Sequence, residues 1–501
     1  MGIKSYVKKG LLEVWPDVFD ARMDDQAAPD LSDVVSGERG FYSDPDQFLQ
    51  RTHLTSSMRE ILEDVAKVLS GDTGGATFIL TSLFGGGKTH TQILLYHALK
   101  TPAKLSALDQ ELAARIAEVG RPLIVIMDCS RASMVPHPQE PCEIGGFSIK
   151  TIWGMLAYRL GAYAKVKHLD SGKAPAPDVD LLKSILSEPG EPVVILLDEI
   201  VHYVFNMEKS EKLRDYAGKV LLFLDYLSRA VEQTPRVVLV ASVQADYRKE
   251  AGQMILHEES MFKGVAGRVF RNLQRESTRI IVPVAPRDVV SVLKKRIFKK
   301  IDPEIARKAR DMLYSGYREN PELFGVETDW HFAPEESGRV MTARDTYPFH
   351  PKYVEVLQEF IPRNPDLQKT RDAIRITRKV IRHLWRSRED PSFIMPWHVD
   401  LRRRDIRRMV LTARFSDFND AVSRDIVSEE GRLGSVSECD KPLLALRIAM
   451  ATFLKTYTYE TFKEPLKVFP DLKDICLMTY DPETFSAENL QPADIQTVLE
   501  D

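Results

Sequence analysis

A glycine-rich segment in the first quarter of the chain has the residue types needed to bind phosphate groups. Residues 82–89 read Ser-Leu-Phe-Gly-Gly-Gly-Lys-Thr and follow an apolar run. Consecutive glycines let backbone N–H groups turn toward phosphate oxygens, and the N-terminus of a following helix favours an anion. The pattern is close to the phosphate loop G-x-x-x-x-G-K-[ST], with Ser82 in place of the first glycine. We therefore predict a nucleotide site in which Lys88 contacts the β- and γ-phosphates. The predicted nucleotide-binding residues are Ser82, Phe84, Gly85, Gly86, Gly87, Lys88, Thr89 and His90.

Two adjacent carboxylates complete the predicted site. Asp198 and Glu199 directly follow the apolar run Val193–Leu197, which is typical of a buried strand. Downstream of a phosphate loop, such a pair is expected to bind a metal ion and to activate water. We predict that Thr89 and Asp198 bind Mg²⁺ and that Glu199 activates the water that attacks the nucleotide. The cofactors expected from this interpretation are ATP and Mg²⁺.

Polar residues after the next apolar run, and arginines beyond it, are further catalytic candidates. Ser242 follows Val237–Ala241 and is the first choice for a contact with the γ-phosphate or the attacking water. Gln244 is the second choice, and a simple turn at the strand end is an open alternative. Arg268 and Arg271 belong to an arginine-rich segment before the fifth apolar run. Either could act as an arginine finger on the nucleotide of a neighbouring subunit, although surface arginines are common before a strand.

These residues need a sheet that brings several strand ends together. Short apolar runs alternate with segments of helical periodicity, which indicates a mostly parallel sheet covered by helices on both faces. The predicted strands are Thr77–Thr81, Leu123–Met127, Val193–Leu197, Val237–Ala241 and Ile280–Val284. The predicted helices are Ser57–Leu69, Thr89–Lys100, Lys150–Lys165, Val179–Ser187, Lys212–Glu232 and Gln244–Asn272. The expected fold class is therefore α/β, with a five-stranded, mainly parallel sheet.

The length of 501 residues predicts more than one domain. Helical periodicity replaces the strands beyond Pro286. We expect an N-terminal segment packed on the core (residues 1–60), a phosphate-loop ATPase core (61–290), a helical or winged-helix lid (291–390) and a further C-terminal segment (391–501). Because the last residues still have a helical pattern, we expect the chain to be part of a longer protein.

Composition excludes several classes of protein. Hydrophobic residues make up 44% of the chain and charged residues 28%, as in an ordinary globular protein. No apolar run is long enough for a membrane-spanning helix, which needs about 20 residues. The four cysteines are too few and too scattered for a disulfide framework or a zinc cluster. We therefore expect a cytoplasmic protein without a membrane partner.

Several segments carry a family resemblance. They are Leu83–His90, Asp17–Asp33 with Leu31–Val35, Tyr347–Pro351 and Lys369–Arg375. With the order of phosphate loop, acidic strand, polar strand end, arginine-rich turn and helical lid, the chain resembles AAA+-type ATPases. Over most of residues 10–390 it resembles a prokaryotic domain-of-unknown-function family of large ATPases, encoded beside a helicase and a DNA methylase in anti-phage defence islands. The resemblance implies an oligomer, with the helicase and the methylase as partners. It also places Arg375 as the nucleotide-sensing lid arginine, although Asp372 stands where glycine is usual.

A basic helix predicts an anionic partner. Its arginines are spaced four, three, four and four residues apart, which places them on one helical face. They are Arg371, Arg375, Arg378, Arg382 and Arg386. Apolar residues on the opposite side are expected to pack into the lid, namely Ala373, Ile374, Val380, Ile381 and Leu384. We predict that the helix contacts DNA phosphates. The alternative, a basic face that pairs with acidic residues of the N-terminal segment, stays open.

The expected function is that of an ATP-hydrolysing motor or switch subunit in a DNA-directed prokaryotic antiviral defence complex. The alternative is a nucleotide-dependent signalling or scaffold ATPase that assembles protein partners without contacting nucleic acid. A third interpretation, a degenerate nucleotide binder, is motivated by Ser82. The intact lysine, threonine and two carboxylates of the predicted site argue against it.

Overall fold

The computed structural model divides the chain into two compact units. Unit 1 comprises Met1–Ala27 and Pro286–Asp501, and unit 2 comprises Ala28–Ala285. The structure describes residues 1–27, 29–35, 40–82, 85–250, 253–258, 260–262, 264–325, 343–459 and 469–501. The segment that we expected at residues 1–60 is thus shared between the two units. Within the described ranges, no helix has both the length and the apolar composition needed to cross a bilayer.

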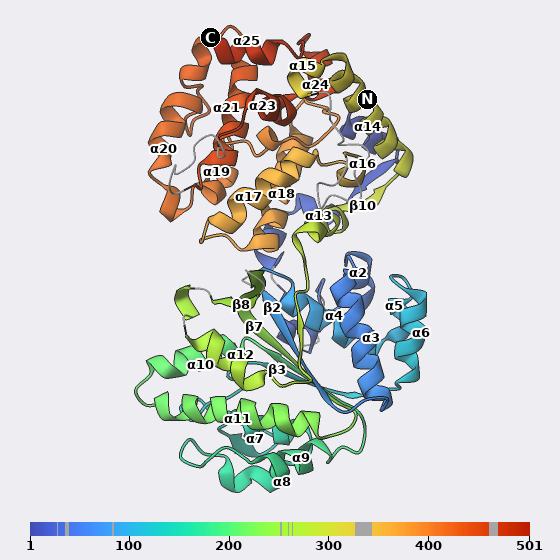
Figure 1. Cartoon of the computed structure of the whole chain (residues 1–501), viewed down its shortest axis with the longest axis vertical. Helices are drawn as coiled ribbons and strands as arrows, with labels where there is room; N and C mark the ends of the chain where they lie inside the picture. Colours follow the sequence, from blue (N-terminus) through green and yellow to red (C-terminus); the bar gives the residue numbers. More distant parts are fainter. Residues whose placement is uncertain are drawn as a thin grey trace. The chain divides into compact units, whose positions relative to one another are not determined.

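Unit 2 is built around a six-stranded sheet. Its strands are β2 (Ala76–Ser82), β3 (Leu123–Asp128), β6 (Val193–Asp198), β7 (Val237–Glu250), β8 (Gln253–Glu258) and β9 (Arg279–Ile281). The order β3-β6-β7-β2-β9 is parallel throughout, and β8 pairs antiparallel with the far end of β7. The predicted five-stranded parallel arrangement is confirmed, and β8 is an addition to it (Figure 1).

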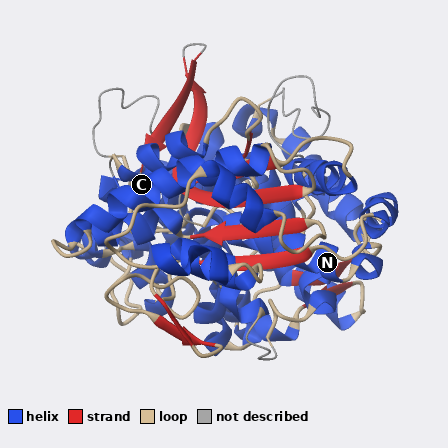
Figure 2. Ribbon diagram, turned by 90° about the horizontal axis from the view of Figure 1, so that it is seen from below, coloured by secondary structure: helices blue, strands red, loops and turns tan. Residues whose placement is uncertain are grey.

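Helices bury both faces of this sheet. Their bounds are α3 Ser56–Ser70, α4 Lys88–Lys100, α6 Gln110–Glu118, α7 Ile152–Arg159, α9 Val179–Leu186, α10 Ile200–Lys209, α11 Arg214–Glu232 and α12 Val265–Leu273. Successive side chains of a strand point to opposite faces. In β6, Ile195 and Leu197 therefore join the core formed with α7, α9, α10, α11 and α12, whereas Val194 and Leu196 join the core formed with α3, α4 and α6. Figure 2 shows helices on either side of the strands.

Two predicted helices of unit 2 differ from the structure. The predicted helix Lys150–Lys165 is interrupted at Gly161, where φ is +74°, and it continues as the short helix α8 (Tyr163–Val166). The predicted helix Gln244–Asn272 is wrong in its first half, because β7 continues to Glu250 and returns as β8. The continuation is stabilised by burial, since Val243 and Ala245 have no exposed surface.

Unit 1 is mainly helical and has one large apolar core. Its longer helices are α13 (Val289–Ile297), α14 (Pro303–Glu319), α17 (Pro351–Arg363), α18 (Lys369–Arg386), α21 (Pro442–Thr456) and α23 (Leu472–Thr479). The N-terminal elements α1 (Ile3–Lys8) and β1 (Leu12–Val14) belong to this unit, and β1 pairs antiparallel with β10 (Phe298–Ile301). The strand β10 corrects the expectation that strands stop at Pro286. Because Ile3, Leu12 and Val18 are fully buried, the first 27 residues are an integral part of the unit 1 core.

Candidate nucleotide-binding site

The glycine-rich segment connects β2 to α4 at the carboxyl edge of the parallel sheet. Gly87 caps the N-terminus of α4 with φ +84°, and a Cβ atom at this position would lie 2.9 Å from Cγ2 of Val284. A side chain larger than hydrogen is therefore disfavoured both by the backbone conformation and by space. Gly85 also has a positive φ, +75°. The segment thus lies between a buried strand and a helix N-terminus, where phosphate groups bind readily.

Lys88 is buried in the first turn of α4. Its ammonium group donates a hydrogen bond to the carbonyl oxygen of Ser82 at 2.8 Å and lies 3.4 Å from the Ser82 hydroxyl. The side chain is folded back along the glycine-rich segment, and only 6% of the residue is exposed. The structure therefore keeps a cation inside the segment that the sequence predicted to surround phosphate groups.

Asp198, the last residue of β6, brings three other predicted residues together. The Thr89 hydroxyl donates to Asp198 Oδ2 at 2.7 Å, and the Ser242 hydroxyl donates to Oδ1. The backbone N–H of Glu199 donates to the same Oδ1 at 3.1 Å. Carboxylate, hydroxyl and water oxygens are the ligands that Mg²⁺ prefers. Thr89 and Asp198 therefore fit the predicted metal site, while Ser242 orients the Asp198 carboxylate.

Glu199 has a strained backbone and a shifted pKa. Its φ of +55° is uncommon for a residue other than glycine, and such strain is concentrated at functional sites. Gln244, which is completely buried, donates from its side-chain amide to Glu199 Oε2 at 2.7 Å. Burial, followed by the negative charge of Asp198, raises the pKa of Glu199 to about 7, although Lys88 and Gln244 act in the opposite direction. The carboxylate thus has the proton affinity of a general base near neutral pH.

A third carboxylate, which we did not predict as a site residue, lies beside this pair. Asp128 ends β3 directly opposite Asp198 in the parallel register. It accepts hydrogen bonds from the N–H and the hydroxyl of Ser130 at 2.9 and 2.7 Å. Burial, together with the negative charge of Asp198, raises the pKa of Asp128 to about 6, although the hydrogen bonds from Ser130 act in the opposite direction. The sequence signal was available, because Asp128 follows one of the predicted strands.

Residues after Thr89 attach α4 to its surroundings. The Gln92 amide donates to main-chain carbonyls of both β6 and β7, at 3.1 and 3.3 Å, and thereby fixes the helix to the two strands that carry the acidic and polar residues. His90, a predicted binding residue, contacts two neighbouring side chains. Its ring lies 3.1 Å from the Thr52 hydroxyl, and its ring centroid lies 4.5 Å from that of Phe48. Its predicted contact with a nucleotide stays a prediction. Phe84, another predicted binding residue, lies outside the described residues.

The predicted catalytic arginines have different surroundings. Arg268 of α12 donates to Glu208 at 2.7 Å, and Arg271 is exposed on the same helix. Arg375 belongs to α18 of unit 1 and donates to Asp372 at 2.9 Å. The roles of these arginines toward a nucleotide stay predictions.

The middle of the arginine stripe on α18 is buried within unit 1. Arg378 and Arg382 are only 4% and 5% exposed. Arg378 donates to Asp17 and Asp24, each at 3.0 Å, and Arg382 donates to both carboxylate oxygens of Asp24 and to the carbonyl of Val18. The predicted DNA contact is therefore wrong for these two arginines. The open alternative holds for them instead, because acidic residues of the N-terminal segment neutralise their charge.

The polar and apolar side chains of α18 lie on opposite sides of the helix, as the periodicity predicts. Arg371 is half-buried and donates to the side chain of Gln368 at 2.9 Å, whereas Arg386 is exposed in the last turn. The predicted apolar residues are all buried, namely Ala373, Ile374, Val380, Ile381 and Leu384. The helix is thus held on one side by apolar packing and on the other by ion pairs.

Family models match nearly the whole chain. The model of the DUF499 N-terminal domain matches residues 1–280, and the model of the DUF499 second domain matches residues 285–501. The chain belongs to the DUF499 family. No curated protein matches it. The boundary between the two DUF499 models lies where unit 2 ends, but the first 27 residues matched by the DUF499 N-terminal model pack in unit 1.

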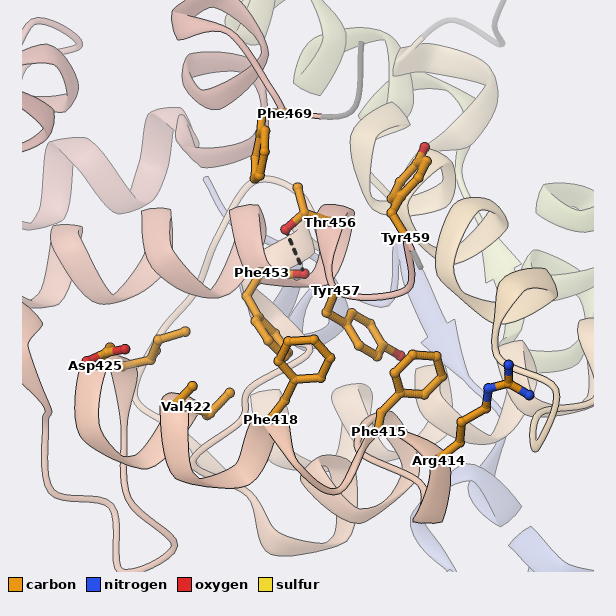
Figure 3. A pocket seen from close by; sticks show the side chains of 12 residues that line it. Arg414, Phe415, Phe418, Val422, Asp425, Phe453, Thr456, Tyr457, Tyr459 and Phe469 are labelled. Carbon is orange, nitrogen blue, oxygen red and sulfur yellow. Dashed lines mark hydrogen bonds between the residues drawn. The ribbon is translucent and has the colours of Figure 1, made fainter. Parts of the chain in front are cut away.

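The DUF499 second domain also contains an aromatic cavity, distinct from the site around Asp198. Its volume is about 590 Å³. The rings of Phe453 and Tyr457 stack in its wall, with centroids 5.0 Å apart and planes inclined by 15°. Figure 3 shows Arg414 and Asp425 at opposite ends of the lining side chains and Phe469 at the top of the view. None of these residues was predicted to be functional from the sequence.

Proposed function

We propose that unit 2 binds ATP together with Mg²⁺ and hydrolyses the nucleotide. The observation that carries the proposal is the convergence of Thr89, Asp198 and Glu199 beside the buried ammonium of Lys88. The strand order also supports it. One strand, β7, lies between the strand that leads into the glycine-rich segment and the strand that ends in the carboxylate pair. AAA+-type ATPases, which have such an additional strand, are the fold family that we propose for unit 2.

Each side chain of the cluster has a task in this proposal. Lys88 neutralises charge on the β- and γ-phosphates, and Thr89 and Asp198 hold Mg²⁺, which acts as a Lewis acid on phosphoryl oxygen. Glu199 accepts a proton from the attacking water. Gln244 holds the accepting carboxylate in place through the hydrogen bond of 2.7 Å. The biological setting, a DNA-directed antiviral complex, remains a proposal that rests on the family resemblance.

Turnover and binding of ATP by the purified chain test the proposal. Lys88→Ala should abolish tight ATP binding, because the segment loses its buried cation. Glu199→Gln keeps the size of the side chain but cannot accept a proton, so ATP should still bind while turnover falls by roughly 10²-fold or more. Glu143→Gln, an exposed glutamate of the same unit, is the matched control and should behave as the wild type. Wild-type turnover by Glu199→Gln would assign the general base to another residue.

Equal ATP affinity of the wild type and Lys88→Ala in calorimetry would remove Lys88 from the site. A wild-type chain that neither binds nor hydrolyses ATP in the presence of Mg²⁺ would overturn the proposal as a whole.

A further inference from the structure

A second basic cluster, apart from the arginines of α18, is exposed in unit 1. Residues 1–13 and 294–310 together contain 11 Lys and Arg residues against Glu13, Asp302 and Glu304. These two segments are distant in sequence, but the pairing of β1 with β10 joins them in unit 1 (Figure 1). Six of their lysines are exposed, and five of these belong to α1, β10 and α13 or directly follow α1, namely Lys8, Lys9, Lys295, Lys299 and Lys300. We refer to these five residues as the lysine ribbon.

An irregularity in the strand pairing explains why two successive lysines are both exposed. In a regular strand, adjacent side chains point to opposite faces. The register shifts between Glu13 and Val14, because Glu13 pairs with Lys300 whereas Val14 pairs with Phe298. Lys299 is thus an extra residue on β10, as in a β-bulge. Phe298 is buried at 4% exposure, while Lys299 and Lys300 both face solvent.

Direct contacts connect the segments of the lysine ribbon. The Lys300 ammonium donates to the carbonyl of Gly10 at 3.0 Å, which places it beside the turn that follows Lys8 and Lys9. The indole N–H of Trp15 donates to the carbonyl of Lys295 at 3.1 Å, which attaches α13 to the end of β1. The lysines therefore belong to elements that contact one another, although they are distant in sequence.

Acidic neighbours offset only part of this charge. Glu13 lies 3.3 Å from Lys299. Asp302 caps α14 by accepting from the backbone N–H of Glu304 at 2.8 Å, and Glu304 pairs with Arg307. The ammonium groups of Lys8, Lys9 and Lys295 are exposed, and mutual repulsion of these like charges makes an anionic partner favourable. By contrast, Arg378 and Arg382 are fully engaged inside the protein.

We propose that the lysine ribbon binds the phosphodiester backbone of nucleic acid. A membrane surface is a poorer fit, because Met1 is the one exposed large apolar side chain among residues 1–14 and 294–310, too few to anchor the segment in lipid. Lysine acts toward phosphate as a point charge, whereas reading of base edges mostly uses arginine, asparagine or glutamine. Binding is therefore independent of sequence and depends strongly on salt. The proposal is separate from ATP hydrolysis, since it concerns residues of unit 1 alone.

Fluorescence anisotropy with the full chain tests this proposal. The probes are a labelled DNA duplex, its single strand and an RNA of the same sequence, each titrated at several salt concentrations. The test variant carries Lys8→Gln, Lys9→Gln, Lys299→Gln and Lys300→Gln. The matched control removes the same number of exposed lysines elsewhere, through Lys100→Gln, Lys167→Gln, Lys212→Gln and Lys473→Gln. Circular dichroism and thermal unfolding verify that both variants are folded.

We expect the test variant to lose at least tenfold in affinity at low salt. Its log–log salt slope should become shallower by roughly 0.9 for each lost phosphate contact on duplex DNA. The control should bind as the wild type does. Equal binding by the test variant and the control would overturn the proposal, and so would a wild type that binds none of the three probes at low salt. Binding of a polyglutamate peptide but of no nucleic acid would assign the surface to an acidic protein instead. Loss of ATP turnover in Glu199→Gln has no bearing on these outcomes, so the two proposals fail independently.

Discussion

The guanidinium group of Arg382 donates to both carboxylate oxygens of Asp24, and the two residues lie 358 positions apart in the chain. Each side chain is only 5% exposed. Arg378 donates to Asp24 Oδ1 as well, at 3.0 Å. Asp24 is thus a shared counter-ion of two buried cations, with Asp17 as a second partner of Arg378, and it joins the first segment of the chain to α18. When one partner of a buried ion pair is removed, the charge left behind costs about 3–5 kcal/mol.

Asp24→Asn should therefore destabilise unit 1 strongly. We expect the free energy of unfolding to fall by about 3 kcal/mol, because two buried guanidinium groups lose their shared counter-ion. Urea unfolding followed by tryptophan fluorescence measures this, since Trp15, Trp385 and Trp397 all belong to unit 1. Asp20→Asn is the control, because Asp20 pairs with Arg22, whose side chain is 89% exposed. That substitution should change the free energy of unfolding far less than Asp24→Asn does, because water screens an exposed ion pair. Equal losses in the two variants would contradict the role assigned to Asp24.

The pH dependence of ATP turnover should report the ionisation of Glu199. A general base works only when it is deprotonated, and burial with the charge of Asp198 raises the pKa of Glu199 to about 7. Turnover should therefore rise from pH 6 to pH 8, with a midpoint within about one unit of the raised value. Initial rates at saturating ATP and Mg²⁺ over this range give the profile. A profile that is flat down to pH 5 would show that no group of raised pKa controls the rate.

The raised pKa of Glu199 also makes the stability of the protein depend on pH. The dependence has the opposite sign to that caused by a salt-bridged carboxylate, whose pKa is lowered in the native state. In the native state Glu199 holds its proton up to about pH 7, whereas in the unfolded chain it releases the proton near its ordinary pKa. The native state thus binds more protons between these two values, and stability from this group is lost as the pH rises through that window. At pH 8, Glu199→Gln should therefore be more stable than the wild type by about 1–2 kcal/mol in free energy of unfolding, and it should unfold at a higher temperature. At pH 4.5 the two proteins should differ little in stability. Thermal unfolding of both proteins at the two pH values decides this, and a stability gain that is equal at both values would contradict it.

Gln244 should act by positioning Glu199. Gln244→Leu removes the amide that donates to the carboxylate at 2.7 Å and favours its charged form. We expect turnover at pH 7 to fall by about tenfold, with the acid limb of the profile moved to higher pH by about half a unit or more. ATP affinity should change little. Gln233→Leu, at an exposed position, is the control. A loss of turnover without a movement of the pH profile would indicate a role in packing only.

The strands and the cluster around Asp198 could be predicted because their signals are local. An apolar run followed by a carboxylate identifies both a buried strand and its end, and parallel pairing then places Asp198 beside Ser242 and Gln244. From the sequence we ranked Ser242 before Gln244, and in the structure both make a contact, the first with Asp198 and the second with Glu199. The alternative of a simple turn at this strand end is excluded, because β7 continues beyond both residues.

The environment of α18 could not be predicted, because it depends on long-range packing. The spacing of its arginines correctly predicts that they share a face. Whether that face meets solvent or protein depends on the path of the first 27 residues, about which helical periodicity contains no information. The same limit applies to β10, since a strand of four residues with two lysines pairs only when β1 lies beside it.

The path of the chain has a consequence for how the protein is made. Unit 1 is formed by two separate segments, residues 1–27 and 286–501, so unit 2 is an insertion within it. During synthesis, Asp24 can pair with Arg378 and Arg382 only after α18 has left the ribosome. All strands of unit 2, by contrast, have been synthesised once the chain reaches Ile281. Unit 2 can therefore fold first, and the core of unit 1 forms last, when residues 286–501 pack around residues 1–27. A gene fragment cut between the two family models, at residues 280–285, would leave Ile3, Leu12 and Val18 in one piece and the core that surrounds them in the other.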